Sequence, residues 1–446
     1  MVKELYEEYF YGKKVTVMGL GLLGRGVGDT LFLAENSADI IVTDTKTRED
    51  LTSSTDALQG YPEIVYHLGL HSTIDFEKRD FILKAAGVPY DSEYIAHAKS
   101  NDIPVYMSAA LISQIVMRSN LGITIIGITG TRGKSTTTQM IAHVLASCGS
   151  RVFLGGNVRG VANLPLLKAL DEGDFLVLEL DSWQLQGFGD LKISPHISVF
   201  TSFLDDHMNY YHNDKELYFN DKAHIYRHQK EYDVLIASPQ AAREIAHRDP
   251  GVIPIIPLER DLKTKLIGEH NHVVAEIVYE VASQCGLDDE SIRNAIASFP
   301  GVEGRLEDCG LFGGTKNIRV FNDNNATSTD ATIAAIDAIN DTHHKRPILI
   351  IGGADKGLSL DSLEQTVLVG TKECIFLEGT GTSRLTLLKE HVFETLPECL
   401  EKAFEVAQEG DIILFSPAFA SFSKYFNNEY ERNDVLMESL KKYTNK

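Results

Sequence analysis

The sequence predicts an α/β protein of two or three domains, and three observations lead to this prediction. Short apolar runs alternate with helical patterns along the whole chain, which is typical of βαβ units. Most of these runs are continuous, as in parallel strands that are buried on both faces. The chain has 446 residues, a length that corresponds to two or three domains.

The apolar runs are the predicted strands, and helical patterns lie between them. The runs occupy residues 13–20, 38–44, 122–129, 174–180, 196–204, 233–238, 346–353, 373–379 and 411–418. Helical periodicity is clear at 135–147 and 331–340. We expect one domain boundary near 117–122, before a new strand, and another after 298–305, where a proline and two glycines interrupt a helical stretch.

Composition and charge argue against several classes of protein. Forty-two basic and 63 acidic residues give a net charge of −21, whereas a partner such as nucleic acid or an anionic membrane requires a basic surface. The five cysteines are scattered and form no Cys-x-x-Cys pair, so we expect reduced thiols in a cytoplasmic protein. The acidic N-terminus lacks the apolar core of a signal peptide, and no run is long enough for a membrane span.

A glycine-rich loop, GLGLLG at Gly19–Gly24, follows the first predicted strand and precedes a helix. Asp44 ends the next strand, twenty positions after Gly24. This is the arrangement of a dinucleotide-binding fold, in which the helix N-terminus attracts a phosphate. The pattern predicts a phosphate-bearing ligand without deciding which nucleotide, and the alternative is a glycine loop that only packs the helix on its strand.

A second glycine-rich loop lies between the predicted strand at 122–129 and the helix at 135–147. It reads Gly130-Thr131-Arg132-Gly133-Lys134-Ser135, and Ile128 stands where the common phosphate-binding pattern has its first glycine. Backbone N–H groups of such a loop face phosphate oxygens, the lysine adds a mobile charge, and the serine hydroxyl is a ligand for Mg²⁺. We therefore expect a nucleoside triphosphate here.

Three acidic residues and a histidine follow later strands. Glu179 ends the run at 174–180, where a carboxylate faces the ligand crevice of a parallel sheet and can hold Mg²⁺. Asp205, Asp206 and His207 follow the run at 196–204. The aspartates can also be helix caps, and the histidine can be a metal ligand or a packed side chain. Nothing in the pattern alone selects Lys222.

Taken together, these stretches are similar to the Mur ligases, the ATP-dependent amide-forming enzymes of peptidoglycan precursor synthesis. The matching stretches lie in the family's order over essentially the whole chain: TGTRGKSTTT, GGN, ELDSWQL, DDHMNYY, DKAHIY, GEHN, GR, NDNNATS, GGADKG and SPAFASF. The resemblance implies a Rossmann-like N-terminal domain (1–117), a central P-loop ATPase-type domain (118–305) and a Rossmann-like C-terminal domain (306–446). The first loop would then serve a uridine diphosphate.

Within the family, the GLGLLG loop with Thr43–Thr45 and the C-terminal SPAFASF stretch most resemble the branch that adds D-glutamate. The implied reaction is ligation of D-glutamate to UDP-N-acetylmuramoyl-L-alanine through an acyl phosphate, with release of ADP, by a cytoplasmic enzyme expected to be a monomer. The alternative is another ligase of the family with a different acceptor or amino acid.

The resemblance also implies which residues contact the substrates. The uracil and diphosphate would be surrounded by Leu22, Leu23, Asp44, Thr45 and Lys46. The muramoyl part would be approached by Asn157 and Gln184. D-Glutamate would be received by Thr327, Lys356, Ser421 and Phe422.

For ATP, the implied phosphate contacts are the loop Gly130–Gly133 with Lys134, Ser135 and Thr136, and the implied adenosine contacts are Asn271, Arg305 and Asp323. Two Mg²⁺ ions would be served by Ser135, Glu179, His207 and Lys222. Lys222 matches the lysine that is carbamylated in the family. Lys134, His207 and Lys222 are thus the expected catalytic residues.

The chain departs from the family at four positions. Arg132 stands where asparagine is usual and Asn325 where many members have lysine; Val274 replaces an asparagine and Asn433 a glycine. These departures affect substrate detail and leave the phosphate lysine and metal ligands intact. Two other classes remain as alternatives: a nicotinamide-dependent dehydrogenase would leave the Lys134 loop without a purpose, and a nucleotide-gated binding module would keep both loops without ligation.

Overall fold

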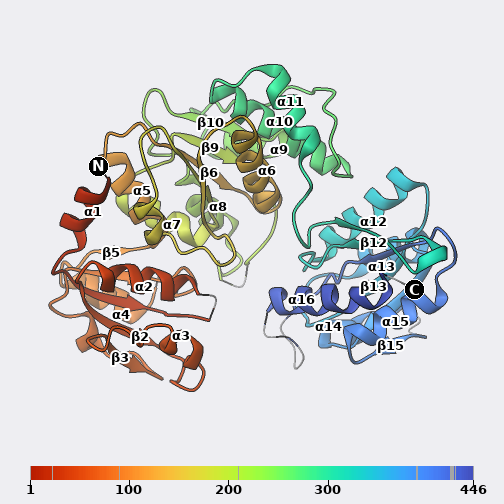
Figure 1. Cartoon of the computed structure of the whole chain (residues 1–446), viewed down its shortest axis with the longest axis horizontal. Helices are drawn as coiled ribbons and strands as arrows, with labels where there is room; N and C mark the ends of the chain where they lie inside the picture. The colour runs from red at the N-terminus through yellow and green to blue at the C-terminus, as the bar shows by residue number, and fades with distance from the viewer. Residues whose placement is uncertain are drawn as a thin grey trace. The chain divides into compact units, whose positions relative to one another are not determined.

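The structure is a computed structural model, and its described residues form two compact units (Figure 1). The described residues are 2–22, 24–89, 91–208, 210–387, 390–421, 426 and 428–444. The first unit comprises Met1–Asp261 and Glu276–Ala295, and the second comprises Leu262–Ala275 and Ile296–Lys446. Three predominantly parallel sheets lie in these units, so the α/β prediction is confirmed.

The first sheet has the strand order β3-β2-β1-β4-β5, and all of its strands are parallel. Its strands are β1 Lys14–Met18, β2 Asp39–Asp44, β3 Val65–Leu68, β4 Phe81–Lys84 and β5 Val105–Tyr106. Its helices are α1 Val2–Phe10, α2 Arg25–Glu35, α3 Thr52–Asp56, the 3₁₀ turn η1 Thr73–Phe76, α4 Glu93–Ser100 and α5 Ser108–Arg118. The predicted Rossmann-like order is therefore present, with its switch point between β1 and β4, where a ligand crevice forms.

The second sheet has the order β10-β9-β6-β8-β7 and is also parallel throughout. Its strands are β6 Thr124–Thr129, β7 Val152–Gly156, β8 Phe175–Glu179, β9 Ile197–Phe200 and β10 Val234–Ala237. Its helices are α6 Lys134–Ser147, η2 Leu164–Lys168, α7 Ser182–Leu191, α8 Lys215–Ala223 and α9 Pro239–Arg248. The central position of β6 places the second glycine loop between the ends of β8 and β9.

One hydrophobic core joins the two sheets of the first unit. Helix α5 contributes Leu111, Ile112 and Ile115, each fully buried, and these pack in one cluster with Val15 of β1 and Leu178 of β8. Because buried apolar area is the main stabilising term of a fold, this continuous cluster holds the two glycine loops in one body.

The third sheet lies in the second unit, with the order β11-β12-β16-β13-β14-β15. Its strands are β11 Glu307–Phe312, β12 Ile318–Asn322, β13 Ile348–Ile351, β14 Glu373–Leu377, β15 Val392–Phe393 and β16 Ile412–Phe415. Among the strand pairs that the structure describes in this sheet, β11–β12 is antiparallel and the others are parallel. The remaining helical segments are α10 Glu269–Gln284, α11 Asp289–Ser298, η3 Gly314–Lys316, α12 Thr329–His343, α13 Asp361–Gly370, α14 Thr380–Arg384, α15 Leu396–Val406, α16 Glu429–Leu440 and η4 Lys441–Tyr443.

All of the predicted strands are present, and most of the strands that the sequence did not predict lie at sheet edges; β4 and β12 are interior exceptions. The predicted runs became β1, β2, β6, β8, β9, β10, β13, β14 and β16, whereas β3, β4, β5, β7, β11, β12 and β15 were missed. The domain limits near residues 117 and 305 stay predictions. In the part of the chain that the structure describes, no helix is long and apolar enough to cross a membrane.

Candidate active site

The second glycine loop forms a tight turn between β6 and α6. Gly130 and Gly133 have φ angles of 148° and 81°, which L side chains rarely adopt. A Cβ atom on Gly130 would also lie 2.0 Å from the Thr201 hydroxyl oxygen. The turn thus needs glycine at position 130 for space as well as conformation, and it brings the loop to the N-terminus of a fourteen-residue helix, where phosphate binding is favoured.

The loop is fastened to the segment that follows β9. The Thr131 N–H donates to the Ser202 carbonyl at 2.7 Å, and the Arg132 N–H donates to the Ser202 hydroxyl at 2.8 Å. The Thr131 hydroxyl accepts from the Leu204 N–H at 2.9 Å and lies 3.1 Å from the Leu204 carbonyl. These bonds tie the loop to the start of the segment that carries Asp205, Asp206 and His207.

Lys134 and Lys222 converge on one carbonyl oxygen. The Nζ atoms of both lysines donate to the Gly130 carbonyl at 2.9 Å, and Lys134 also donates to the Thr131 carbonyl at 3.1 Å. Lys222 is only 1 % exposed. Burial, followed by repulsion from Lys134, holds the pKa of Lys222 well below its usual value. The structure therefore places next to the phosphate loop the lysine that no sequence pattern selected.

Glu179 and Ser135 also meet at the loop. Glu179 ends β8 and is 7 % exposed, and its carboxylate accepts from the Ser135 hydroxyl at 3.0 Å. A carboxylate and a hydroxyl at the mouth of a phosphate loop are the oxygen ligands that Mg²⁺ prefers. This pair fits a magnesium ion, although no group of three or more acidic, histidine or cysteine side chains gathers around a common metal position among the described residues.

His207 has a constrained conformation beside Trp183. Its φ angle is 54°, a left-handed conformation that tends to persist at functional sites. Its ring lies 4.8 Å from the Trp183 ring, centroid to centroid. Burial is the main cause that lowers the His207 pKa, and Lys134 and Lys222 lower it further, so the imidazole is neutral at pH 7. Trp183 had no predicted role, and its packing against His207 has no signature in the sequence.

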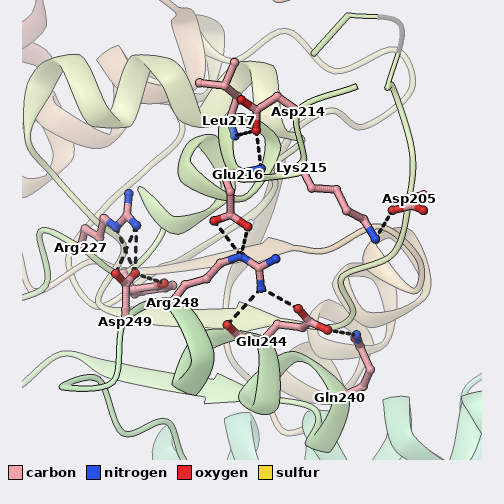
Figure 2. A network of polar contacts seen from close by, with 11 residues as sticks. Asp205, Asp214, Lys215, Glu216, Leu217, Arg227, Gln240, Glu244, Arg248 and Asp249 are labelled. Carbon is pink, nitrogen blue, oxygen red and sulfur yellow. Dashed lines mark hydrogen bonds and ion pairs between the residues drawn. The ribbon is translucent and has the colours of Figure 1, made fainter. Parts of the chain in front are cut away.

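A polar network connects α8 and α9 near the start of the segment that carries Asp205, Asp206 and His207 (Figure 2). The Arg248 guanidinium donates to Glu216 at 2.9 Å and to Glu244 at 2.6 Å. The same guanidinium lies over the rings of Phe203 and Phe219. The Gln240 side-chain amide makes two hydrogen bonds to the Phe203 backbone: it accepts from the Phe203 N–H and donates to the Phe203 carbonyl, each at 2.7 Å. The start of the segment is therefore held from the loop side and from α9.

Asp44, at the end of β2, holds the backbone of the first glycine loop in place. Its carboxylate accepts from the Gly21 N–H at 3.2 Å and from the Lys46 N–H at 2.9 Å, and Asp44 is 5 % exposed. Leu22, Thr45 and Lys46 are exposed beside it. Leu23, which was also predicted to contact the nucleotide, lies outside the described residues.

The predicted muramoyl-binding residues differ in their surroundings. The Asn157 side chain accepts a hydrogen bond from Arg25 of α2 at 2.5 Å. Gln184 is 5 % exposed and completes a capping box: its N–H donates to Asp181 and its side chain accepts from the Asp181 N–H. The cap accounts for Gln184 within the helix, and its predicted contact with the substrate remains a prediction.

Helix α2 is docked against the segment that contains Asn157 and η2. Asp29 is 5 % exposed and accepts from the Leu164 N–H at 2.8 Å. A Cβ atom on Gly28 would lie 2.5 Å from the Ala162 Cβ, so only glycine permits this approach. At the far end of the helix, Glu35 pairs with Lys168. The first glycine loop is thus connected through α2 to the segment between β7 and η2.

Asp29 gives this contact a pH dependence. Burial raises its pKa from 3.8 to about 6, so the folded chain retains a proton that the unfolded chain releases between these values. Stability should therefore fall as pH rises from about 4 to about 6. We expect Asp29→Asn, which keeps an acceptor for Leu164, to be more stable than the parent by about 3 kcal/mol above pH 6, with the advantage shrinking toward pH 4. Denaturant unfolding across this pH range measures the difference, and an equal advantage at every pH would contradict it; Asp56→Asn, at an exposed carboxylate, is the control.

In the second unit, two of the residues predicted for adenosine, Arg305 and Asp323, lie at the turn before β11. Asp323 is 9 % exposed; it accepts from the Leu306 N–H at 3.0 Å and from the Ser416 hydroxyl at 2.8 Å. This bond holds the backbone next to the exposed Arg305. Asn271, near the start of α10, is buried, and its amide donates to the Ile267 carbonyl at 2.7 Å.

The residues predicted for the amino acid are partly brought together. The Lys356 Nζ donates to the Thr327 hydroxyl at 2.9 Å. The loop that carries Lys356 is held by Asp355, whose carboxylate pairs with Arg384 at 2.5 Å and accepts from the Gly357 N–H at 2.9 Å. Ser421 is 4 % exposed, and Phe422 lies outside the described residues.

The departures from the family pattern have structural partners in the second unit. The Asn433 amide accepts from Asn322 at 2.8 Å and donates to Glu303 at 2.6 Å. The Asn325 N–H donates to the Gly304 carbonyl at 2.9 Å. Both asparagines therefore support the turn before Arg305. Val274 is a buried core residue, and for Arg132 the structure shows a backbone role in the loop.

Comparison with known proteins gives the decisive observation. Residues 128–252 match the Mur ligase middle domain. The UDP-N-acetylmuramoylalanine–D-glutamate ligases of Roseiflexus sp. (strain RS-1) and Borreliella afzelii are 31 % and 32 % identical, over 97 % and 93 % of this chain and 99 % and 95 % of theirs. The chain belongs to the Mur ligase family. As a Mur ligase it is an ATP-dependent enzyme that forms an amide with release of ADP, which decides against the dehydrogenase and the binding module.

Solved structures show the same fold. The UDP-N-acetylmuramate–alanine ligase MurC of Thermotoga maritima superposes with a TM-score of 0.61 at 19 % identity, covering 96 % of this chain and 99 % of that one. MurF of Acinetobacter baumannii gives a TM-score of 0.58 at 15 % identity, covering 98 % and 92 %. The three-domain α/β architecture expected of a Mur ligase is thus confirmed.

Proposed function

We propose that this Mur ligase joins D-glutamate to UDP-N-acetylmuramoyl-L-alanine in the cytoplasmic synthesis of peptidoglycan precursors. The observation that supports this choice is the full-length similarity to relatives that bear the name of this activity, at 30 % identity or above. The two phosphate loops of the first unit agree with it, since the reaction needs one nucleotide-linked acceptor and one nucleoside triphosphate.

The chemistry begins with an anionic nucleophile. The L-alanine carboxylate attacks the γ-phosphorus of ATP, the bond to the β-phosphate oxygen breaks, and an acyl phosphate and ADP result. Both reactants are anions, so positive charge must lie between them. The Lys134 ammonium and the N-terminus of α6 supply part of this charge. Ser135 and Glu179, with His207, would hold Mg²⁺, which when bound adds charge at the phosphates.

The amine of D-glutamate then displaces phosphate. The neutral amine adds to the acyl carbon, and the tetrahedral intermediate collapses with loss of phosphate and of the amine's proton. The acyl phosphate must be protected from water during this step. In the second unit, the Lys356 ammonium beside the Thr327 hydroxyl is suited to bind a carboxylate of the incoming amino acid.

We also propose that Lys222 is carbamylated. Its lowered pKa provides the neutral amine that attacks CO₂, and the product is a carbamate and a released proton. Both lysines share the Gly130 carbonyl, so an ammonium at Lys222 would repel Lys134, whereas a carbamate there would attract Lys134 and could serve as a ligand of a second Mg²⁺. Carbamylation therefore turns an unfavourable pair into a favourable one.

The amino-acid and acceptor specificity can be tested by one panel of assays. ADP and phosphate release are measured with ATP, Mg²⁺, UDP-N-acetylmuramoyl-L-alanine and one amino acid at a time: D-glutamate, L-glutamate, L-alanine, L-lysine and meso-diaminopimelate. We expect turnover with D-glutamate alone. Turnover with a different amino acid, or only with a different UDP-linked acceptor, would assign the chain to another activity of the family.

A further inference from the structure

Arg25 connects the first glycine loop to the predicted muramoyl-binding residue. It is the first residue of α2 and directly follows Gly24 of the loop. Its Nη1 atom donates to the Asn157 side-chain oxygen at 2.5 Å, across 132 residues of sequence. No motif included Arg25, because an arginine at the start of a helix has no signature of its own.

The Arg25 bond determines which way the Asn157 amide faces. A guanidinium carries only donors, so the Asn157 side chain must present its oxygen to Arg25 and turn its NH₂ group away from it. The Asn157 N–H donates to the Glu179 carbonyl at 2.7 Å, and the Glu179 carboxylate accepts from Ser135 of the ATP loop. One series of hydrogen bonds therefore runs from the first loop through Asn157 to the second.

The surrounding contact is rigid enough for a single bond to fix this orientation. Gly28 and Asp29, on the next turn of α2, contact Ala162 and Leu164. Asn157 is followed by the segment that these contacts hold, and Asn163 in turn accepts from the Gly156 N–H at 2.7 Å. The backbone on both sides of the Arg25–Asn157 bond is thus fixed, and the remaining freedom is the rotation of the amide.

We propose that Arg25 is a positioning residue for the UDP-linked substrate, because it holds the Asn157 amide with its NH₂ donor turned toward the sugar. This inference rests on the proposed function. It assigns Arg25 an effect that passes through Asn157, on the part of the substrate beyond the diphosphate. Correct positioning of a single donor is enough to change the binding of a substrate group several-fold.

The test compares binding of UDP with binding of UDP-N-acetylmuramoyl-L-alanine by calorimetry, together with the KM values for this acceptor and for ATP. We expect Arg25→Met to weaken binding of the full acceptor and raise its KM about tenfold, with the affinity for UDP and the KM for ATP unchanged. Arg25→Lys, which can still donate, should recover part of the loss. Lys168→Gln removes a cation from the far end of the same contact and should change none of these values.

Two variants of Asn157 separate positioning from simple stabilisation. Asn157→Asp keeps the acceptor for Arg25 but lacks the NH₂ donor, so we expect a loss of acceptor affinity as large as that of Arg25→Met without a loss of thermal stability. In an Asn157→Ala background, Arg25→Met should have less than about a twofold further effect, because the two residues act as one unit.

Three results would overturn the inference. These are equal losses of UDP and acceptor affinity in Arg25→Met, additive losses in the double variant, and an unchanged acceptor KM in Arg25→Met. A parent enzyme that fails to ligate UDP-N-acetylmuramoyl-L-alanine would instead contradict the proposed function, so the two failures are distinguishable.

Discussion

Lys134→Ala should lose at least about 10²–10³-fold of its ligase turnover while the fold remains intact. Lys134 donates to two carbonyls of the loop proposed to hold the phosphates, at 2.9 Å to Gly130 and 3.1 Å to Thr131. The first chemical step brings a carboxylate against the γ-phosphate of ATP. Removal of a positioned charge raises the barrier of this step more than it weakens binding. ADP release under saturating substrates measures the effect.

The control for this variant is Lys230→Ala. Lys230 is exposed and precedes the amino end of the edge strand β10, whereas the second glycine loop follows the carboxyl end of β6. It should retain parental turnover. Circular dichroism and thermal unfolding should show Lys134→Ala to be folded. ADP release by Lys134→Ala at a near-parental rate would contradict the role of this lysine.

Lys222→Ala should reduce turnover by about 10- to 100-fold, the size of loss expected for a group that supports a metal site. The replaced side chain is buried against the Gly130 carbonyl, so the variant leaves space where a small carboxylate can take the place of the carbamate. We therefore expect acetate to restore part of the activity of Lys222→Ala and to leave the parent unchanged. Formamide at the same concentration is the matched neutral control.

Removal of CO₂ should lower the activity of the parent reversibly and have no effect on Lys222→Ala. An unchanged parental rate without CO₂ would contradict the carbamate.

The uncarbamylated amine of Lys222 also affects the stability of the fold. In CO₂-free buffer, between the lowered pKa of folded Lys222 and the usual lysine pKa of 10.5, the unfolded chain holds a proton at Lys222 that the folded chain has released. Stability should therefore rise with pH in this window. Lys222→Met should thus be more stable than the parent, by an amount that narrows toward high pH.

Local patterns predicted the parts of the structure that local physics determines. The apolar runs gave β6, β8 and β9 because strands buried on both faces must be apolar throughout. The glycine loops were predicted because their backbone angles exclude other residues. Strands such as β4 and β7 were missed although several predicted strands are no longer, because their positions depend on pairing with β1 and β8, which are distant in the sequence.

The candidate site shows the same division. Ser135 and Glu179 were predicted from their places at the ends of a strand and a helix, and the structure brings them together. Lys222 was identified by resemblance alone. Its side chain matters because it contacts the Gly130 carbonyl, and the two residues are 92 positions apart in the sequence. Arg25 and Trp183 were not found at all. Their contacts with Asn157 and His207 arise from tertiary packing, which leaves no local pattern.

Activation of the acceptor carboxylate by ATP can be followed through the fate of the carboxylate oxygen atoms. UDP-N-acetylmuramoyl-L-alanine labelled with ¹⁸O in both oxygens of the alanine carboxylate is turned over with ATP and D-glutamate, and the released phosphate is analysed by mass spectrometry. An acyl phosphate requires one carboxylate oxygen to leave with the phosphate, so each phosphate should carry one ¹⁸O and the amide product should retain one. Phosphate without label, released at the rate of product formation, would rule out an acyl phosphate formed from the acceptor carboxylate.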